Sequence, residues 1–123
     1  MHIISTILVV VVALEAIGIM LLEMFGSPQK LSAAFGFSEA YTRMAETRIS
    51  MKNQGLYNGF IGIGLLINRF AFPDNAQYSG SILFVAFVCI AAVYGAITAQ
   101  NIKILLLQGT PAILALLSLL FLK

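Results

Sequence analysis

The chain has 123 residues, of which 60% are hydrophobic and only 10% are charged, whereas about a quarter of the residues in a soluble domain are charged. Its net charge of +2 and its dispersed basic residues exclude a nucleic-acid-binding protein. The composition predicts a single integral membrane domain over residues 1–123, because too little polar sequence is left for a separate soluble domain.

The first membrane span is predicted over residues 3–25, a length that matches the roughly 20 residues needed to cross the hydrocarbon core. Glu15 directly follows the apolar run, where a secretory signal would have small residues at a cleavage site. We therefore expect the segment to remain uncleaved.

The loop that follows, residues 26–48, is predicted to contain a short helix at the membrane interface over residues 28–35. Ser27 can cap this helix, Pro28 suits its first position and Gly36 suits its end. Its apolar side chains and the phenylalanine after it are expected to dip into the lipid headgroups: Leu31, Phe35 and Phe37.

Three more spans follow the loop. From Ser38, which can cap a helix, no proline interrupts the sequence until Pro73, so one long helix should leave the loop and cross the membrane over about residues 49–72. A third span is predicted over residues 79–99, and a tight hairpin then leads to the fourth over residues 104–122.

The predicted fold class is therefore all-α: an integral membrane four-helix bundle with a short interfacial helix in the first loop. Pro111 lies inside the fourth span and lacks a backbone donor, so it should kink the helix and free the carbonyl of Leu107. Cys89 is the only cysteine, which excludes an intrachain disulfide and argues against a metal site built on thiolates.

The basic residues predict the orientation of the bundle. Five fall on the side of the first loop and the third connection, and two on the opposite side: Lys30, Arg43, Arg48, Lys52 and Lys103 against Arg69 and Lys123. By the positive-inside rule, the loop over residues 26–48 is cytoplasmic and both termini lie outside the inner membrane of a bacterial cell.

A stripe of glycines marks the start of the second span. Gly55, Gly59 and Gly62 fall within about 60° of one another at the 100° turn of each helical residue. Such a stripe lets two helices approach closely. It predicts either close packing within the monomer or a homodimer through the same three glycines.

Polar side chains are concentrated in the cytoplasmic half of the predicted spans. Counting about 1.5 Å per residue places Glu15 and Asn58 at a similar depth, with Gln108 in the same half. We therefore predict a polar cavity, open toward the cytoplasm or the inner leaflet, beneath an apolar outer half formed by residues 3–14, 62–66, 82–93 and 112–122. The candidate ligand-binding residues are Glu15, Glu23, Asn53, Gln54, Tyr57, Asn58, Tyr94 and Gln108.

Glu15 is expected to form the floor of this cavity. A charged carboxylate at mid-membrane costs about 2.5 kcal/mol or more, so Glu15 should be protonated at neutral pH or hydrogen-bonded to Asn58 and Tyr57. Glu23 lies nearer the interface, where Lys52 or Arg48 could pair with it. Any single amide has an alternative role as an interhelical hydrogen bond worth about 0.6 kcal/mol.

Four segments resemble a widespread bacterial family of small membrane proteins, the domain-of-unknown-function family numbered 1304. They are VALEAIGIMLLEMFG, NQGLYNGF, YGAIT and LLLQGTPAILALL, and the likeness covers nearly the whole chain. The resemblance implies four hydrophobic segments and signature carboxylates and amides at Glu15, Glu23, Asn53, Gln54, Asn58 and Gln108. It implies no particular activity.

A more local likeness concerns the first span. The segment LEAIGIMLLEMF is similar to the first helix of small multidrug resistance transporters, which are also four-helix proteins with a membrane-embedded glutamate early in the chain. This resemblance implies proton-coupled export. The rest of the chain departs from that family, because it has no tryptophan and has an amide-rich second helix.

Three functions are compatible with these features. The favoured one is binding or transport of a small, partly lipophilic molecule in the cavity, with Glu15 able to couple this process to protons.

The second function is that of a membrane enzyme, which could use Glu15 or Glu23 as general acid or base with Tyr57 or Tyr94 as donor. The segment ETRISMKNQ resembles the glutathione-binding stretch of four-helix membrane transferases, although its spacing differs. The third is a structural or partner-binding subunit.

Catalysis is the less favoured of these. The sequence shows no Ser/His/Asp set, no metal-spaced ligands and no phosphate loop. We therefore predict no catalytic residue, no metal and no cofactor. The expected partners are the lipid bilayer and a small-molecule ligand, and no nucleic acid.

Overall fold

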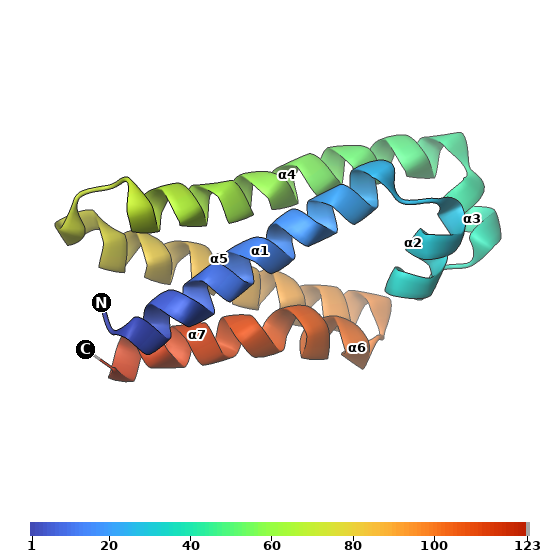
Figure 1. The fold of residues 1–123 in the computed structure, drawn as a ribbon. Coiled ribbons are helices and arrows are strands. Elements are labelled where there is room, and N and C mark those ends of the chain that lie inside the picture. The colour runs from blue at the N-terminus through green and yellow to red at the C-terminus, as the bar shows by residue number, and fades with distance from the viewer. Residues whose placement is uncertain (123) are drawn as a thin grey trace.

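The computed structural model describes residues 1–122, and these are almost entirely helical (Figure 1). Its helices are α1 (Ile3–Phe25), α2 (Pro28–Phe35), α3 (Glu39–Arg43), α4 (Ala45–Phe70), α5 (Asp74–Ala99), α6 (Ile102–Ile104) and α7 (Thr110–Phe121), with a π-helical turn η1 (Leu105–Gly109) between the last two. No strand occurs within the described residues. The all-α class predicted from the sequence is confirmed.

Four long helical segments form the body of the protein: α1, α4, α5 and the nearly continuous run from α6 through α7. They pack in a closed ring in which α1 contacts α4 and α7, and α5 contacts the same two. Both termini lie at the same end as the connection between α4 and α5, whereas α2, α3 and α6 lie at the opposite end (Figure 1). The most extensive contact is between α1 and α4.

Three of these segments are long and apolar enough to cross a membrane, namely Ile3–Phe25, Asp74–Ala99 and Ile102–Phe121. The fourth, α4, has the same 26 residues as α5 but does not meet this description. The reason lies in its composition, because it carries four side-chain amides: Asn53, Gln54, Asn58 and Asn68. The structure thus supports three candidate spans where the sequence predicted four.

The short helix in the first loop was predicted with its correct bounds. The Ser27 side chain accepts a hydrogen bond from the Lys30 amide, and Gly36 ends α2 in the left-handed conformation at φ +73°. The expectation that its apolar side chains enter the lipid headgroups was wrong for Leu31, whereas Phe37 is 39% exposed and its contact with lipid stays a prediction. Leu31 is only 2% exposed and is therefore packed inside the protein, and Phe35 lines a cavity between the helices.

The single long helix predicted after Ser38 is interrupted. Met44 has an extended backbone, with ψ at 136°, and separates α3 from α4. The buried hydroxyl of Thr42 donates a 2.8 Å hydrogen bond to the carbonyl of Pro28, which ties α3 to the start of α2. Because α3 is held in this way, the chain has to turn at Met44 before α4 can begin.

The last helical segment is irregular where the sequence predicted a kink. The Thr110 amide donates to the carbonyl of Leu105, five residues earlier, so the helix passes through a π-helical turn directly before Pro111. The tight connection before it was also predicted. Gln100 adopts a left-handed conformation at φ 50°, and a new helix begins at Ile102.

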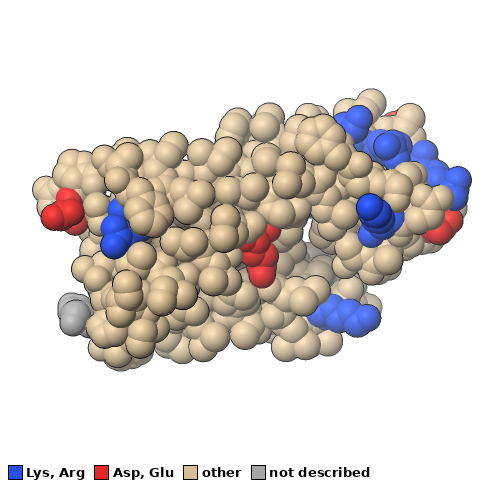
Figure 2. Space-filling model, in the orientation of Figure 1, with Lys and Arg blue, Asp and Glu red and all other residues tan. Residues whose placement is uncertain are grey.

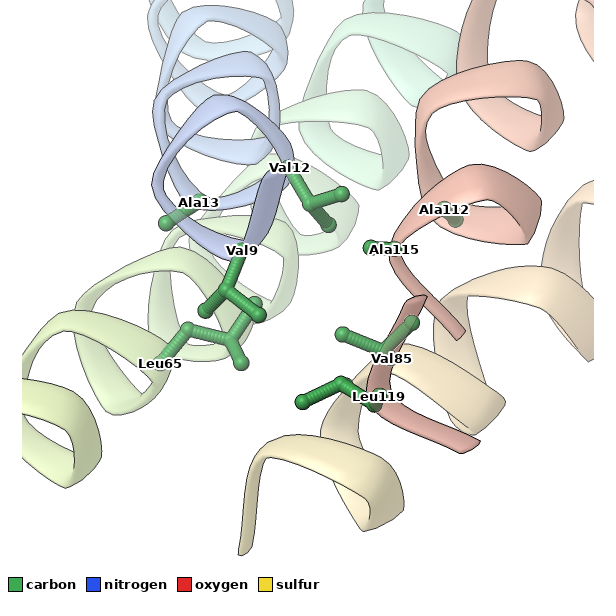
Figure 3. Packing of buried hydrophobic residues seen from close by; sticks show 8 residues of the cluster. All are labelled: Val9, Val12, Ala13, Leu65, Val85, Ala112, Ala115 and Leu119. Carbon is green, nitrogen blue, oxygen red and sulfur yellow. The ribbon is translucent and has the colours of Figure 1, made fainter. Parts of the chain in front are cut away.

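The apolar core lies between the four long segments in the half of the molecule nearer the termini. Its side chains come from α1, α4, α5 and α7 and point toward one another (Figure 3): Val9, Val12, Ala13, Leu65, Val85, Ala112, Ala115 and Leu119. All eight fall within the four stretches that the sequence assigned to an apolar half. That prediction is confirmed for the core.

Beyond this core, at the end with the termini, lies a polar cluster that the sequence analysis missed. Asn68, 1% exposed, donates 3.0 Å and 3.2 Å hydrogen bonds to the carbonyl of Gln77 and the hydroxyl of Ser81. Arg69 donates 3.1 Å hydrogen bonds to the Thr6 hydroxyl and the Gln77 side-chain oxygen. We call these five residues the terminal polar cluster.

Candidate functional site

The glycine stripe of α4 brings this helix directly against α1. Gly55, Gly59 and Gly62 are all buried. A Cβ atom added at Gly62 would lie 2.6 Å from the backbone oxygen of Ala13, and one added at Gly55 would lie 3.0 Å from the Cβ atom of Glu23. Only glycine permits so close an approach, and the stripe is occupied by α1 of the same chain.

This close contact places Glu23 between two amides of α4. Gln54 donates a 2.7 Å hydrogen bond from Nε2 to one carboxylate oxygen of Glu23, and Asn58 donates a 2.5 Å hydrogen bond from Nδ2 to the other. Glu23 is only 2% exposed. Gln54 and Asn58 are four residues apart on one helix, so their side chains lie on the same face and can hold both oxygens together.

The sequence analysis assigned these partners differently. It allowed Glu15 to be either protonated or hydrogen-bonded to Asn58 and Tyr57, and it allowed Glu23 to pair with Lys52 or Arg48. Asn58 instead donates to Glu23, and among the described residues Glu23 forms no ion pair. Counting residues from the membrane boundaries gave the wrong register between α1 and α4. The actual register follows from the glycine stripe, since Gly55 meets Glu23 and thereby brings the amides of α4 to that carboxylate.

Glu15 lies two turns earlier on α1 and is half-buried. It accepts no hydrogen bond from any residue in the described part of the chain. Together with Asn58 and Gln108 it lines a cavity of 290 Å³ whose other walls are apolar: Val12, Ala16, Ile19, Ile61, Phe87, Val88 and Ala91. In Figure 2, acidic atoms lie midway along the molecule beside a hollow in the surface.

A second cavity of 450 Å³ adjoins the first on the side of α2 and α3. Its polar side chains include Glu23, Gln54, Asn58 and Gln108, and its wall on the loop side is aromatic: Phe35, Phe37 and Tyr41. A third cavity of 240 Å³ lies against Glu15 and Phe35. Ile19 and Gln108 line all three, and we call the three together the central cavity.

Gln108 reaches the central cavity from the π-helical turn. The turn spans Leu105–Gly109 and adds a residue to the local helical repeat, which rotates the side chains before Pro111 relative to those after it. π-helical turns occur frequently at functional sites. Here the irregular turn places an amide at the point where the three cavities meet.

Charge is distributed unevenly around the central cavity. Glu15 and Glu23 are the only charged residues among the described residues that line it. Lys and Arg side chains lie instead toward the two ends of the molecule (Figure 2). Among the described residues, neither Glu15 nor Glu23 forms an ion pair with a base.

Five of the eight predicted site residues line the central cavity, namely Glu15, Glu23, Gln54, Asn58 and Gln108. The other three do not. Tyr57 and Tyr94 are 70% and 69% exposed, and Asn53 is also exposed. Tyr57 instead packs edge-on against the ring of Phe60, 6.2 Å away between centroids.

The aromatic wall was missed as part of a site. Phe37 lies between Phe35 and Tyr41, with ring centroids 6.3 Å and 5.2 Å away. The signal was present in the sequence, because these rings are closely spaced in an otherwise polar loop. Thr98 also lines the cavity, but its hydroxyl is engaged by the carbonyl of Tyr94 at 2.9 Å.

Within residues 1–122, no group of three or more His, Cys, Asp or Glu side chains could hold a metal ion. The polar groups of the central cavity are carboxylates and amides. They can bind a ligand through hydrogen bonds and charge.

Comparison with known proteins identifies the family. The family described as "Protein of unknown function (DUF1304)" matches residues 10–120. The chain belongs to the DUF1304 family. It is also similar to the uncharacterized protein YpaA of Lactococcus lactis subsp. lactis (strain IL1403), with 40% identity over 119 residues, which are 96% of this chain and 98% of that protein. No solved structure matches the chain.

The family resemblance seen in the sequence is thereby confirmed. The matched range of this DUF1304 chain includes all five predicted residues that line the central cavity.

Proposed function

We propose that this DUF1304 protein crosses the membrane four times and binds a small, partly lipophilic molecule in the central cavity. The fourth span would be α4. Three of its four amides have partners inside the protein, because Gln54 and Asn58 donate to Glu23 and Asn68 donates to Gln77 and Ser81. Polar groups that are satisfied internally are compatible with a lipid environment.

The orientation that we propose follows from the unequal number of basic residues at the two ends of the molecule. Five bases lie in the segments from α2 to the start of α4 and in α6, and the termini are at the opposite end (Figure 1). By the positive-inside rule the first end is cytoplasmic, so the central cavity opens on that side of a bacterial inner membrane. In cells, a membrane-impermeant maleimide should label Asn75→Cys and spare Ser32→Cys in a Cys89→Ala background, and the reverse pattern would refute this orientation.

The observation that carries the binding proposal is the environment of Glu15. An ionisable side chain in the middle of a bundle normally pairs with another group of the protein. Glu15 lines a cavity and accepts no hydrogen bond from the described residues. A molecule with an apolar body and a polar group would fill the walls and supply the missing partner, which is the usual composition of a small-molecule site.

Transport of the ligand and formation of a homodimer are two further predictions. Transport would require the cavity to exchange its ligand with the opposite side, and proton coupling through Glu15 would be one way to drive it. A homodimer through Gly55, Gly59 and Gly62 also stays a prediction, and the packing of these glycines against α1 favours their role within the chain.

The proposal is tested with protein in lipid nanodiscs. Small molecules extracted from the purified wild type should include a species that is depleted from Glu15→Gln. Adding it back at 100 times its dissociation constant should stabilise the wild type by about 2.7 kcal/mol and the variant by much less. Glu46→Gln, at an exposed acid outside the cavity, is the matched control. Identical extracts and identical stabilisation in all three proteins would refute binding at Glu15.

A further inference from the structure

The central cavity is lined by two acids and, among the described residues, by no base. Glu15 and Glu23 line it, and no Lys, Arg or His is among the described residues that do so. A protonated amine and a carboxylate attract one another more strongly where the local dielectric is lower than that of bulk water. A cationic ligand is favoured by this arrangement and an anionic one is repelled.

The hydrogen bonds of Glu23 also decide which atoms its two amides can offer. An ionised carboxylate only accepts hydrogen bonds, so Gln54 and Asn58 must turn their NH₂ groups toward it. Their side-chain oxygens are left without a donor among the described residues. Asn58 lines the 290 Å³ cavity together with Glu15, whereas Glu23 lines only the adjoining cavity. The Asn58 oxygen is therefore the acceptor that this residue can offer to a ligand beside Glu15.

We propose that the ligand of the central cavity is a lipophilic amine in its protonated form. This inference rests on the proposed function and names the chemical class of its ligand. The ammonium N–H groups would donate to the Glu15 carboxylate and to the Asn58 side-chain oxygen. The hydrocarbon part would lie against Ile19, Phe87 and Val88, which line the same cavity.

The aromatic wall supports the same class. Phe35, Phe37 and Tyr41 line the adjoining cavity, and the faces of aromatic rings attract ammonium groups. A neutral alcohol could use the acceptors but would gain nothing from the charge. A quaternary ammonium has the charge but no N–H donor, so it would leave the amide oxygens without partners.

The test compares four probes with the same eight-carbon tail: octylamine, octyltrimethylammonium, octanol and octanoate. Each is titrated calorimetrically into protein in nanodiscs, and empty nanodiscs provide the correction for partitioning into lipid. Octylamine should bind about tenfold more tightly than octyltrimethylammonium, because only the amine supplies charged hydrogen bonds. Octanol should bind more weakly than octylamine, and octanoate should show no specific binding.

Two variants separate charge from amide orientation. Glu15→Gln should weaken octylamine binding by about tenfold or more. In Glu23→Gln the new amide can donate as well as accept, so one neighbouring amide can reverse and present NH₂ to the cavity. The preference for octylamine over octyltrimethylammonium should then fall toward one. A purely structural role of Glu23 would weaken both probes equally, and Glu46→Gln should leave the preference unchanged.

The outcomes distinguish the two proposals. If octanol or octanoate binds more tightly than octylamine and loses affinity in Glu15→Gln, the cavity binds ligands but the amine class is wrong. If octyltrimethylammonium binds as tightly as octylamine, the role of the amide oxygens is refuted. If no probe binds the wild type above the empty-disc correction, the amine class is refuted, whereas the proposed function fails only if the extracts and the stabilisation of the wild type and Glu15→Gln are also identical.

Discussion

The terminal polar cluster and the central cavity both join α1 and α4 to neighbouring elements, yet they differ in how completely their polar groups are paired. In the terminal polar cluster, Asn68 and Arg69 donate to acceptors on Thr6, Gln77 and Ser81. The central cavity contains one closed group around Glu23, and beside it the Glu15 carboxyl group and amide oxygens that have no donor among the described residues. Polar groups that line a cavity without a protein partner are available to a ligand, whereas a fully paired cluster indicates a structural role.

The largest loss of stability and binding is expected from a substitution in the glycine stripe, because the terminal polar cluster and the central cavity both depend on the contact between α1 and α4. Gly62→Leu would force a side chain into the backbone of α1, where even a Cβ atom would lie 2.6 Å from the oxygen of Ala13. Separating α1 from α4 should lower the free energy of unfolding by about 3 kcal/mol, measured by denaturant unfolding in detergent micelles. It should also abolish octylamine binding.

The matched control for that variant is Gly18→Leu. A Cβ atom at Gly18 would have no neighbour within 4 Å, so the substitution should leave stability and binding close to the wild type. Equal losses from Gly18→Leu and Gly62→Leu would show that the glycine stripe does not set the distance between α1 and α4.

A smaller effect, confined to stability, is expected from Asn68→Leu. This change removes the buried donor of the terminal polar cluster and leaves the Ser81 hydroxyl and the Gln77 carbonyl with one hydrogen bond fewer. The free energy of unfolding should fall by about 1–3 kcal/mol, while octylamine affinity per folded molecule stays unchanged. Asn53→Leu, at an exposed amide, should cost much less. A comparable loss of ligand affinity in Asn68→Leu would mean that the two regions are coupled.

The sequence predicted the fold best where local signals mark the ends of helices. The bounds of α1 and α2 follow directly from length, a serine cap, a proline and a glycine. The break at Met44 could not be predicted, because it depends on the Thr42 hydroxyl reaching the carbonyl of Pro28 across the loop. No local pattern encodes that contact.

The geometry of the candidate site also depends on contacts between distant residues, which the sequence alone does not predict. Periodicity and depth brought most of the amides and both carboxylates to one cavity, but they did not show which carboxylate the amides hold. That choice depends on the register between α1 and α4, which the contact of Gly55 with Glu23 sets. The predicted partner and the actual partner of Asn58, Glu15 and Glu23, are about two turns apart on α1. Rotation about the helix axis also decided that Tyr57 and Tyr94 face outward.

The smallest expected effect concerns pH and tests the contrast between the two carboxylates. Octylamine stays protonated through the neutral and acidic range, so its affinity should fall only as the carboxylates of the central cavity gain protons on lowering the pH. Among the described residues, the titratable side chains that line the cavity are Glu15, Glu23 and Tyr41, and the two glutamates are its only acids. Calorimetric titrations at several pH values should show weaker binding at lower pH in the wild type and a shallower dependence in Glu15→Gln. A dependence of equal steepness in both proteins would assign the change of charge to Glu23, and the distinction between a paired and an unpaired acid would then fail.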